Sequence, residues 1–181
     1  MDEAQIIARV RTGAAEAFAE IVEHYQVPIV RYLSRLAGDR DVAEDLAQDT
    51  FVQAYQGILK TKSDLHFKAW LYRIATNNAL QFHRRRRLLS FIPFTGKDRP
   101  DMPDTNASSD LVIERMTIQQ ALMTVPHKRR ECLVLHFMEG FKYQEIADMV
   151  GSTEEAVRKR VARGSREFRT AYGRLSGEEQ G

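Results

Sequence analysis

The stretch "FKYQEIADMVGSTEEAVRKRVARGSREF", residues 141–168, decides the fold because it predicts two helices that meet at a tight turn. Gly151 stands where such a turn needs a left-handed backbone, and Ser152 or Thr153 can cap the helix that follows. The buried face of each helix is formed by small or apolar residues at helical spacing, namely Ile146, Ala147 and Val150, then Val157 and Val161. The pattern predicts a helix-turn-helix.

The second of these helices carries a basic surface. Its outward residues are Arg158, Lys159, Arg160, Arg163, Arg166 and Arg169, and Glu167 is the one acid between Arg158 and Arg174. Cations on a helix that can enter a major groove indicate a recognition helix for duplex DNA. An arginine that contacts a guanine edge distinguishes DNA sequences, whereas an arginine that contacts only a phosphate does not. The amino-acid sequence alone does not tell which arginines make which contact. The alternative is a helical hairpin in an interaction protein, with the arginines as a solvated face.

A second basic segment is "WLYRIATNNALQFHRRRR", residues 70–87. It begins with aromatic and apolar residues at helical spacing, passes two asparagines and ends on four arginines. Aromatics and amides suit unstacked bases, and arginines suit the phosphates beside them, which indicates single-stranded DNA. The alternative is a core helix whose terminal arginines favour its dipole.

Helical periodicity extends over most of the remaining chain, and no useful length alternates with a period of two residues. Asp41, with Glu44 three residues on, predicts a capped helix that runs to about Leu59. The stretch "SFIPFTGKDRPDMPDTNASSD" is rich in proline and aspartate and predicts a flexible linker. We therefore expect an all-α chain of two small helical domains, with residues 1–89 as the first, 90–110 as the linker and 111–181 as the second, which contains the helix-turn-helix.

Composition excludes several classes of protein. The net charge of the 181 residues is only +2, so any electrostatic function must come from local segregation of charge. The five histidines are scattered, and neither metal-ligand spacing, a glycine-rich phosphate loop nor a nucleophile motif is present, so we expect no enzyme, no metal and no cofactor. Cys132, the one cysteine, fits a reducing cytoplasm, and we see no signal peptide or membrane-spanning segment.

The order of several blocks resembles a bacterial RNA polymerase sigma factor of the extracytoplasmic-function (ECF) group, within the sigma-70 family. The blocks are "AFAEIVEHY", "DRDVAEDLAQDTFVQAY", "FKAWLYRIATNNALQFHRRRR", the linker, "ALMTVPHKRRECLVLHFMEGFKYQEIADMVG" and the basic helix. The resemblance covers about Ala14 to about Leu175. It implies a factor that directs core polymerase to promoters with minus-35 and minus-10 elements and helps to melt them.

The resemblance also implies roles for particular residues. Those expected to dock on the clamp coiled coil of the largest polymerase subunit are Glu44, Asp45, Gln48 and Asp49. Those expected at the minus-10 element are Lys60, Lys62, Ser63, His66, Trp70, Arg73, Asn77, Asn78, Arg84, Arg85, Arg86 and Arg87. Those expected at the minus-35 element are Glu155, Arg158, Lys159, Arg160 and Arg163.

Two further expectations follow from the resemblance. ECF factors are usually inhibited by an anti-sigma factor, often anchored in a membrane, so we expect such a partner. Members of the group commonly have a small residue and then Thr before the valine at position 157, whereas this chain has Glu155 and Ala156, which predicts altered minus-35 contacts. The alternative function is a stand-alone helix-turn-helix regulator that binds duplex DNA without polymerase.

Overall fold

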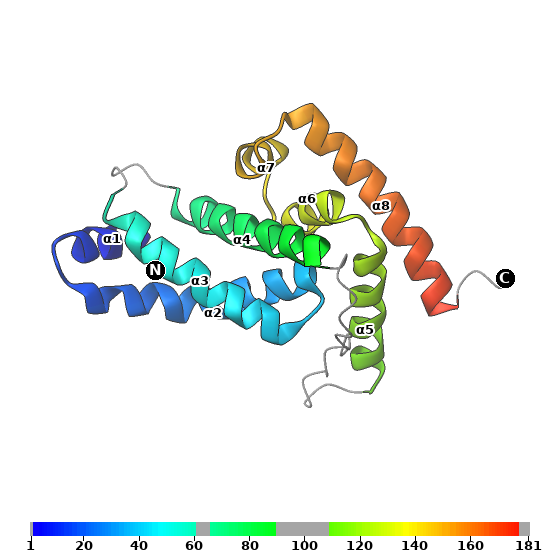
Figure 1. Ribbon diagram of the computed structural model, residues 1–181, viewed down its shortest axis with the longest axis horizontal. Coiled ribbons are helices and arrows are strands. Elements are labelled where there is room, and N and C mark those ends of the chain that lie inside the picture. Colours follow the sequence, from blue (N-terminus) through cyan, green and yellow to red (C-terminus); the bar gives the residue numbers. More distant parts are fainter. Residues whose placement is uncertain (1, 61–65, 90–108, 178–181) are drawn as a thin grey trace. The chain divides into compact units, whose positions relative to one another are not determined.

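The computed structural model describes residues 2–60, 66–89 and 109–177, and every regular element in these ranges is helical, which confirms the all-α prediction. In chain order the elements are α1 (Glu3–Arg11), the 3-10 helix η1 (Ala15–Ala17), α2 (Phe18–Ala37), α3 (Arg40–Ile58), α4 (Phe67–Leu89), α5 (Ser109–Thr124), α6 (His127–Phe137), α7 (Tyr143–Val150) and α8 (Glu154–Ser176) (Figure 1). Most of the predicted linker lies outside the described residues, while Ser109 and Asp110 already belong to α5.

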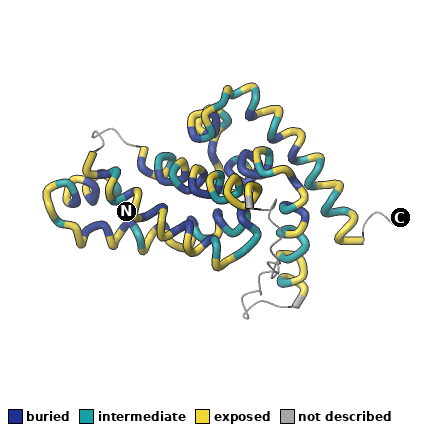
Figure 2. Tube along the Cα trace, in the orientation of Figure 1, coloured by how far each residue is buried: buried dark blue, intermediate teal, exposed yellow. Residues whose placement is uncertain are grey.

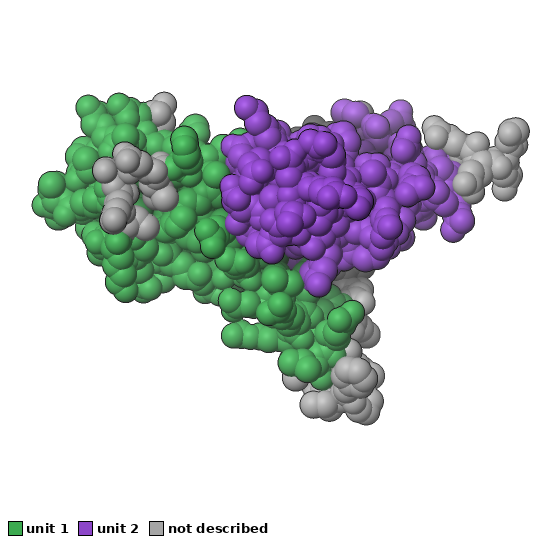
Figure 3. Space-filling view, turned by 90° about the horizontal axis from the view of Figure 1, so that it is seen from above, with its two compact units in different colours: residues 1–34, 40–95 green, residues 35–39, 96–181 purple. Residues whose placement is uncertain are grey.

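The chain divides into two compact units, which Figure 3 distinguishes by colour. The first unit comprises residues 1–34 and 40–95, and the second comprises residues 35–39 and 96–181.

The first unit is built around α2, α3 and α4, along which buried and exposed positions recur at helical spacing (Figure 2). Its largest fully buried side chains include Tyr32, Tyr72, Phe67, Ile21, Ile29 and Leu33. A polar contact crosses this core, because the Tyr32 hydroxyl and Thr76 Oγ1 lie 2.8 Å apart and share a hydrogen bond between α2 and α4. Satisfied polar groups of this kind specify how two helices meet.

The start of α3 differs from the prediction. The helix begins at Arg40, so Asp41 lies inside its first turn and is not the cap. Glu44 pairs with Arg40, one turn earlier, at 3.0 Å. Asp39 holds the position before the helix, so the predicted cap was placed two residues too late.

The second unit contains the predicted helix-turn-helix in α7 and α8. Gly151 ends α7 with φ 61° and ψ 50°, the left-handed conformation that glycine adopts without a Cβ penalty. Thr153 caps α8, and its side-chain oxygen accepts a hydrogen bond from the amide of Ala156 at 3.2 Å. The buried face of α7 is formed by Ile146, Ala147 and Met149, and the predicted Val150 is only partly buried.

Arg130 stabilises the junction between α5 and α6. Its buried guanidinium donates to the carbonyl of Val125 at 3.0 and 3.2 Å and to that of Met123 at 3.2 Å. These carbonyls lie at the end of α5, where a helix has no intrahelical donors left for them. Burial lowers the pKa of Arg130 to about 10, so the group still carries its charge at neutral pH.

Candidate nucleic-acid interface

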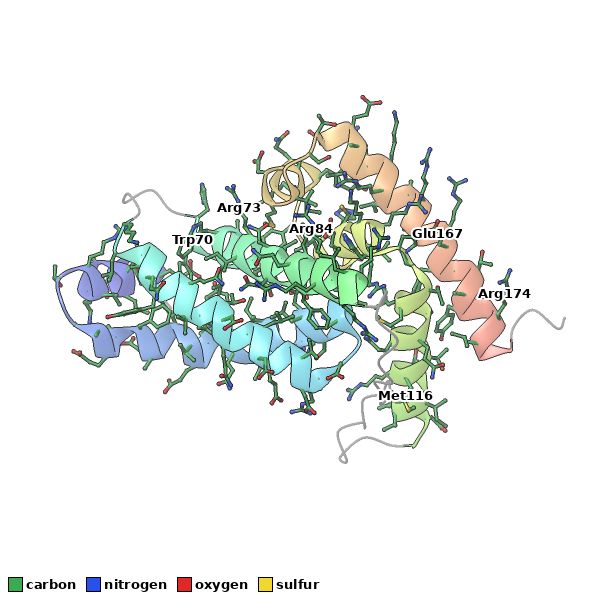
Figure 4. All side chains as sticks on the ribbon, in the orientation of Figure 1. Trp70, Arg73, Arg84, Met116, Glu167 and Arg174 are labelled. Carbon is green, nitrogen blue, oxygen red and sulfur yellow. The ribbon has the colours of Figure 1, made fainter. Side chains whose placement is uncertain are left out.

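One exposed stripe runs along α4, on the side away from the core. Its exposed members recur three or four residues apart and are Arg73, Asn77, Gln81, Arg84 and Leu88, with the partly buried Trp70 at its start. Figure 4 labels Trp70, Arg73 and Arg84 along this helix. Such a stripe places an aromatic ring, two amides and cations on one surface, which is the combination that suits unpaired bases and their phosphates. We call it the α4 stripe; Gln81 is a member that sequence reasoning missed, although it lies four residues after Asn77.

The other arginines of the run, Arg85, Arg86 and Arg87, are exposed as well. Arg85 and Arg86 point to other sides of the helix than the α4 stripe, whereas Arg87, three residues after Arg84, borders it. Their positive charge surrounds the end of α4 on several sides.

Asn78 does not belong to this surface. It is buried, its Nδ2 donates to Thr50 Oγ1 at 3.1 Å, and its Oδ1 accepts from Gln53 Nε2 at 3.0 Å. The amide thus links α4 to α3, and the expectation that Asn78 contacts DNA is corrected. Its neighbour Asn77 is exposed, because adjacent helical residues point about 100° apart.

The residues before α4 were expected to contribute to the same site. Lys60 and His66 are exposed on either side of a gap, and His66 accepts from the Trp70 amide through its carbonyl at 3.0 Å. Lys62 and Ser63 lie outside the described residues. The described part therefore places Lys60 and His66 at the surface of the first unit.

A second surface lies on α3, and we call it the α3 stripe. The four predicted docking residues, Glu44, Asp45, Gln48 and Asp49, are all exposed there. Val52 follows at the same helical spacing with 56% of its surface exposed. Carboxylates beside an exposed valine suit a basic partner helix that also has apolar residues.

The first turns of α8 carry the expected minus-35 residues, and two of these cations are paired. Arg158 Nη2 donates to Glu154 Oε1 at 2.5 Å, and Lys159 Nζ lies 2.6 Å from Glu155 Oε1. Both cations remain mostly exposed, and so does Glu155. The carboxylate of Glu155 therefore competes with any phosphate for Lys159.

Arg160 points elsewhere. It is only partly exposed and acts electrostatically on Glu131 and Cys132, both of which lie on α6. Position 160 lies three residues after Val157 and four before Gly164, both buried, so it belongs to the inward side of α8. Its charge therefore acts on Glu131 and Cys132, and contact of Arg160 with DNA stays a prediction.

Two titratable groups beneath Arg160 have displaced pKa values. Burial raises the pKa of Glu131 to about 7, and the nearby charges of Arg160 and Lys128 oppose this shift. Burial, together with the Glu131 charge, raises the pKa of the Cys132 thiol to about 11, against the effect of Arg160. The thiol is therefore not a reactive nucleophile at neutral pH.

Arg163 is exposed on α8 and also lines a groove of about 620 Å³ beside Thr124 of α5. Further lining residues include Arg166, Arg174, Ala171 and Leu175. Glu167, labelled with Arg174 in Figure 4, also lines it and forms an ion pair with Arg129 of α6. The groove thus combines arginines with apolar side chains.

Two other kinds of site are absent from the described ranges. They contain no group of three or more His, Cys, Asp or Glu side chains that could hold a metal ion. No helix among residues 2–60, 66–89 and 109–177 is both long and apolar enough to cross a bilayer.

Comparisons with known proteins agree with this arrangement. Residues 21–88 match the family "Sigma-70 region 2", and residues 115–168 match "Sigma-70, region 4". The chain is 30% identical over 173 residues to the ECF RNA polymerase sigma factor SigW of Bacillus subtilis (strain 168), with 90% of this chain and 92% of SigW covered. It is 31% identical over 169 residues to the RNA polymerase sigma-H factor of Pseudomonas aeruginosa, covering 88% of each. The chain belongs to the ECF group of bacterial RNA polymerase sigma factors.

Solved structures share the fold. The sigma factor RpoE of Bartonella quintana, in complex with the anti-sigma factor NepR, matches with a TM-score of 0.72 and 24% identity, over 85% of this chain and 95% of that one. CnrH, in complex with the cytosolic domain of CnrY, matches with a TM-score of 0.69 and 22% identity, over 93% and 95%.

Proposed function

We propose that this chain binds core RNA polymerase through the α3 stripe and opens the minus-10 element over the α4 stripe, while α8 binds the minus-35 duplex. The observation that carries the proposal is the two-sided character of α4. One side is anchored to α2 and α3 through Thr76 and Asn78, and the opposite side presents Arg73, Asn77 and Arg84 to solvent. A rigid platform of this kind can offset the few kcal/mol that extruding a base costs.

The α3 stripe is the proposed contact with the clamp coiled coil of the largest polymerase subunit. Its acidic and amide groups would meet basic groups, and Val52 would add apolar contact. In this role the chain is a specificity subunit with no catalysis of its own, and it acts in the cytoplasm, where polymerase and chromosome are.

Inhibition by an anti-sigma factor is proposed from the relatives. Two structural neighbours were solved as complexes, one with the anti-sigma factor NepR and one with the cytosolic domain of CnrY. An inhibitor that covers the α3 stripe would block polymerase, and an acidic, partly apolar segment would suit the groove beside Arg163. A membrane anchor on that inhibitor is part of the proposal.

Transcription with purified components tests the function. Core polymerase plus the chain should start transcripts at a defined set of promoters on a bacterial genomic template, and sequencing their ends should reveal shared minus-35 and minus-10 elements. Core polymerase alone is the control. If the chain binds duplex DNA but neither binds polymerase nor supports any start, it is a stand-alone regulator and the proposal is wrong.

A further inference from the structure

Arg158 is held in place by a chain of contacts that begins in another helix. Its guanidinium carbon lies 5.4 Å from the ring centroid of Tyr143 in α7, a cation–π distance. Tyr143 is itself stacked on His136 of α6, with ring centroids 4.3 Å apart and an angle of 29° between the rings. His136 Nδ1 lies 3.0 Å from the carbonyl oxygen of Phe141, which fixes that ring in turn.

Glu154 holds the same guanidinium from one turn earlier on α8, through Nη2 at 2.5 Å. The arginine is nevertheless accessible, with 63% of its side chain exposed. A guanidinium has five N–H donors, and Glu154 occupies one nitrogen, so the planar fork can still meet two acceptors. Arg158 is therefore both oriented and available.

Lys159 presents a different arrangement. It pairs with Glu155 on its own helix at 2.6 Å, and 67% of its side chain is exposed. An ammonium on a flexible stem acts as a point charge, which suits a phosphate at a loosely defined position. The two neighbouring cations thus differ in how strongly the protein fixes their geometry.

We propose that Arg158 is the base-reading residue of α8, directed at the O6 and N7 atoms of a guanine in the minus-35 element, and that Tyr143 and Glu154 are its positioning residues. Lys159 then contacts phosphate. A guanine edge is bound by two parallel hydrogen bonds. Orienting the guanidinium before binding reduces the conformational entropy that the side chain loses on association. This inference rests on the proposed binding of the second unit to promoter DNA.

The same contacts have an alternative effect, which the experiment distinguishes from the positioning of Arg158. Glu154 and Tyr143 could withhold Arg158 from DNA, which would weaken binding to every sequence equally. Replacement of Glu154 by Gln would then raise affinity for all duplexes and leave discrimination unchanged.

The test measures binding of the full chain, with core polymerase, to a promoter found by transcript sequencing and to variants with each minus-35 base pair exchanged. The wild-type chain should lose about 5- to 150-fold in affinity when the guanine read by Arg158 is replaced. Arg158→Lys keeps the charge but lacks the fork, so it should abolish discrimination at that one base pair and leave discrimination at the others. Tyr143→Leu and Glu154→Gln should weaken discrimination at the same base pair.

Lys159→Ala is the matched control. It should lower affinity for all duplexes by one common factor and reduce the slope of log K against log salt by about 1. Retention of the full discrimination pattern by Arg158→Lys would overturn the inference, as would a Glu154→Gln variant that binds every duplex more tightly with unchanged discrimination. A wild-type chain that distinguishes no base pair would instead refute the proposed function. If Tyr143→Leu fails to fold, Glu154→Gln and Arg158→Lys decide the question.

Discussion

The indole of Trp70 in α4 lies against Gly57 of α3 so closely that a Cβ added at Gly57 would come within 2.6 Å of Trp70 Cζ2. Glycine inside a helix costs about 1 kcal/mol relative to alanine, so its presence here needs a compensating reason. The ring centroid of Phe67 lies 5.8 Å from that of the indole. Trp70 is thereby oriented at the start of the α4 stripe by both α3 and α4.

A double-mutant cycle tests this relationship. In the wild-type background Gly57→Ala should displace the indole and lower the free energy of unfolding, because overpacking costs about 1–3 kcal/mol and exceeds the helix-propensity gain. In a Trp70→Ala background Gly57→Ala should instead raise the free energy of unfolding by about 1 kcal/mol. Trp70 is the one tryptophan of the chain, so its fluorescence reports the displacement directly. Equal effects in both backgrounds would mean that the indole does not occupy this place.

Charge reversal tests the α3 stripe. Asp45→Lys with Asp49→Lys should weaken binding to core polymerase by about 100-fold or more, because like charges would face each other across the interface. Both side chains are exposed, so the far-UV circular dichroism spectrum should not change. The matched control reverses two exposed acids elsewhere in the first unit, Glu16→Lys with Glu23→Lys, and should bind like the wild type. Unchanged affinity in the Asp45 and Asp49 variant would remove the α3 stripe from the docking surface.

The adjacent asparagines of α4 should behave differently. Asn78→Ala removes the hydrogen bonds to Thr50 and Gln53 inside the unit and should lower the free energy of unfolding by about 2 kcal/mol. Asn77→Ala should change it by less than about 0.5 kcal/mol, since that side chain is exposed, but should slow open-complex formation. Urea unfolding and permanganate footprinting of melted promoter measure the two effects. Loss of stability in Asn77→Ala would place its amide in the core.

Local chemistry explains what the sequence could predict. The turn between α7 and α8 depends on Gly151 and Thr153, and both act through their own backbone and nearest neighbours. The spacing of apolar residues likewise predicts which side of a helix is buried, whatever that side packs against. Arg160 could have been placed inward by its spacing from Val157, and Val52 outward by its spacing from Asp45.

Partners across helices explain what the sequence could not predict. Asn78 is polar and follows another asparagine, and its buried position depends on Thr50, which is 28 residues earlier. The distinction between Arg158 and Lys159 depends on Tyr143, which reaches α8 only because α7 folds against it. Such contacts require the tertiary arrangement, which no local pattern encodes.

Glu131 should make the stability of the second unit depend on pH. Its pKa is raised from 4.5 to about 7 in the folded chain, so between these values the folded state holds a proton that the unfolded state has released. The contribution of Glu131 to the free energy of unfolding should therefore be highest below about pH 4.5. It should fall by up to about 3 kcal/mol as the pH rises through 7. Arg160 and Lys128 face the carboxyl and limit the loss.

Glu131→Gln removes the titration while keeping the shape. The variant should match the wild type at pH 4 and exceed its stability at pH 8, because the amide stays neutral where the buried carboxylate becomes charged. Urea unfolding at both pH values measures the difference, and Glu114→Gln, an exposed acid on α5, is the control that should run parallel to the wild type. If the Glu131→Gln and wild-type curves also ran parallel, the carboxyl would be solvated in the folded chain, and Arg160 would be free to turn toward DNA.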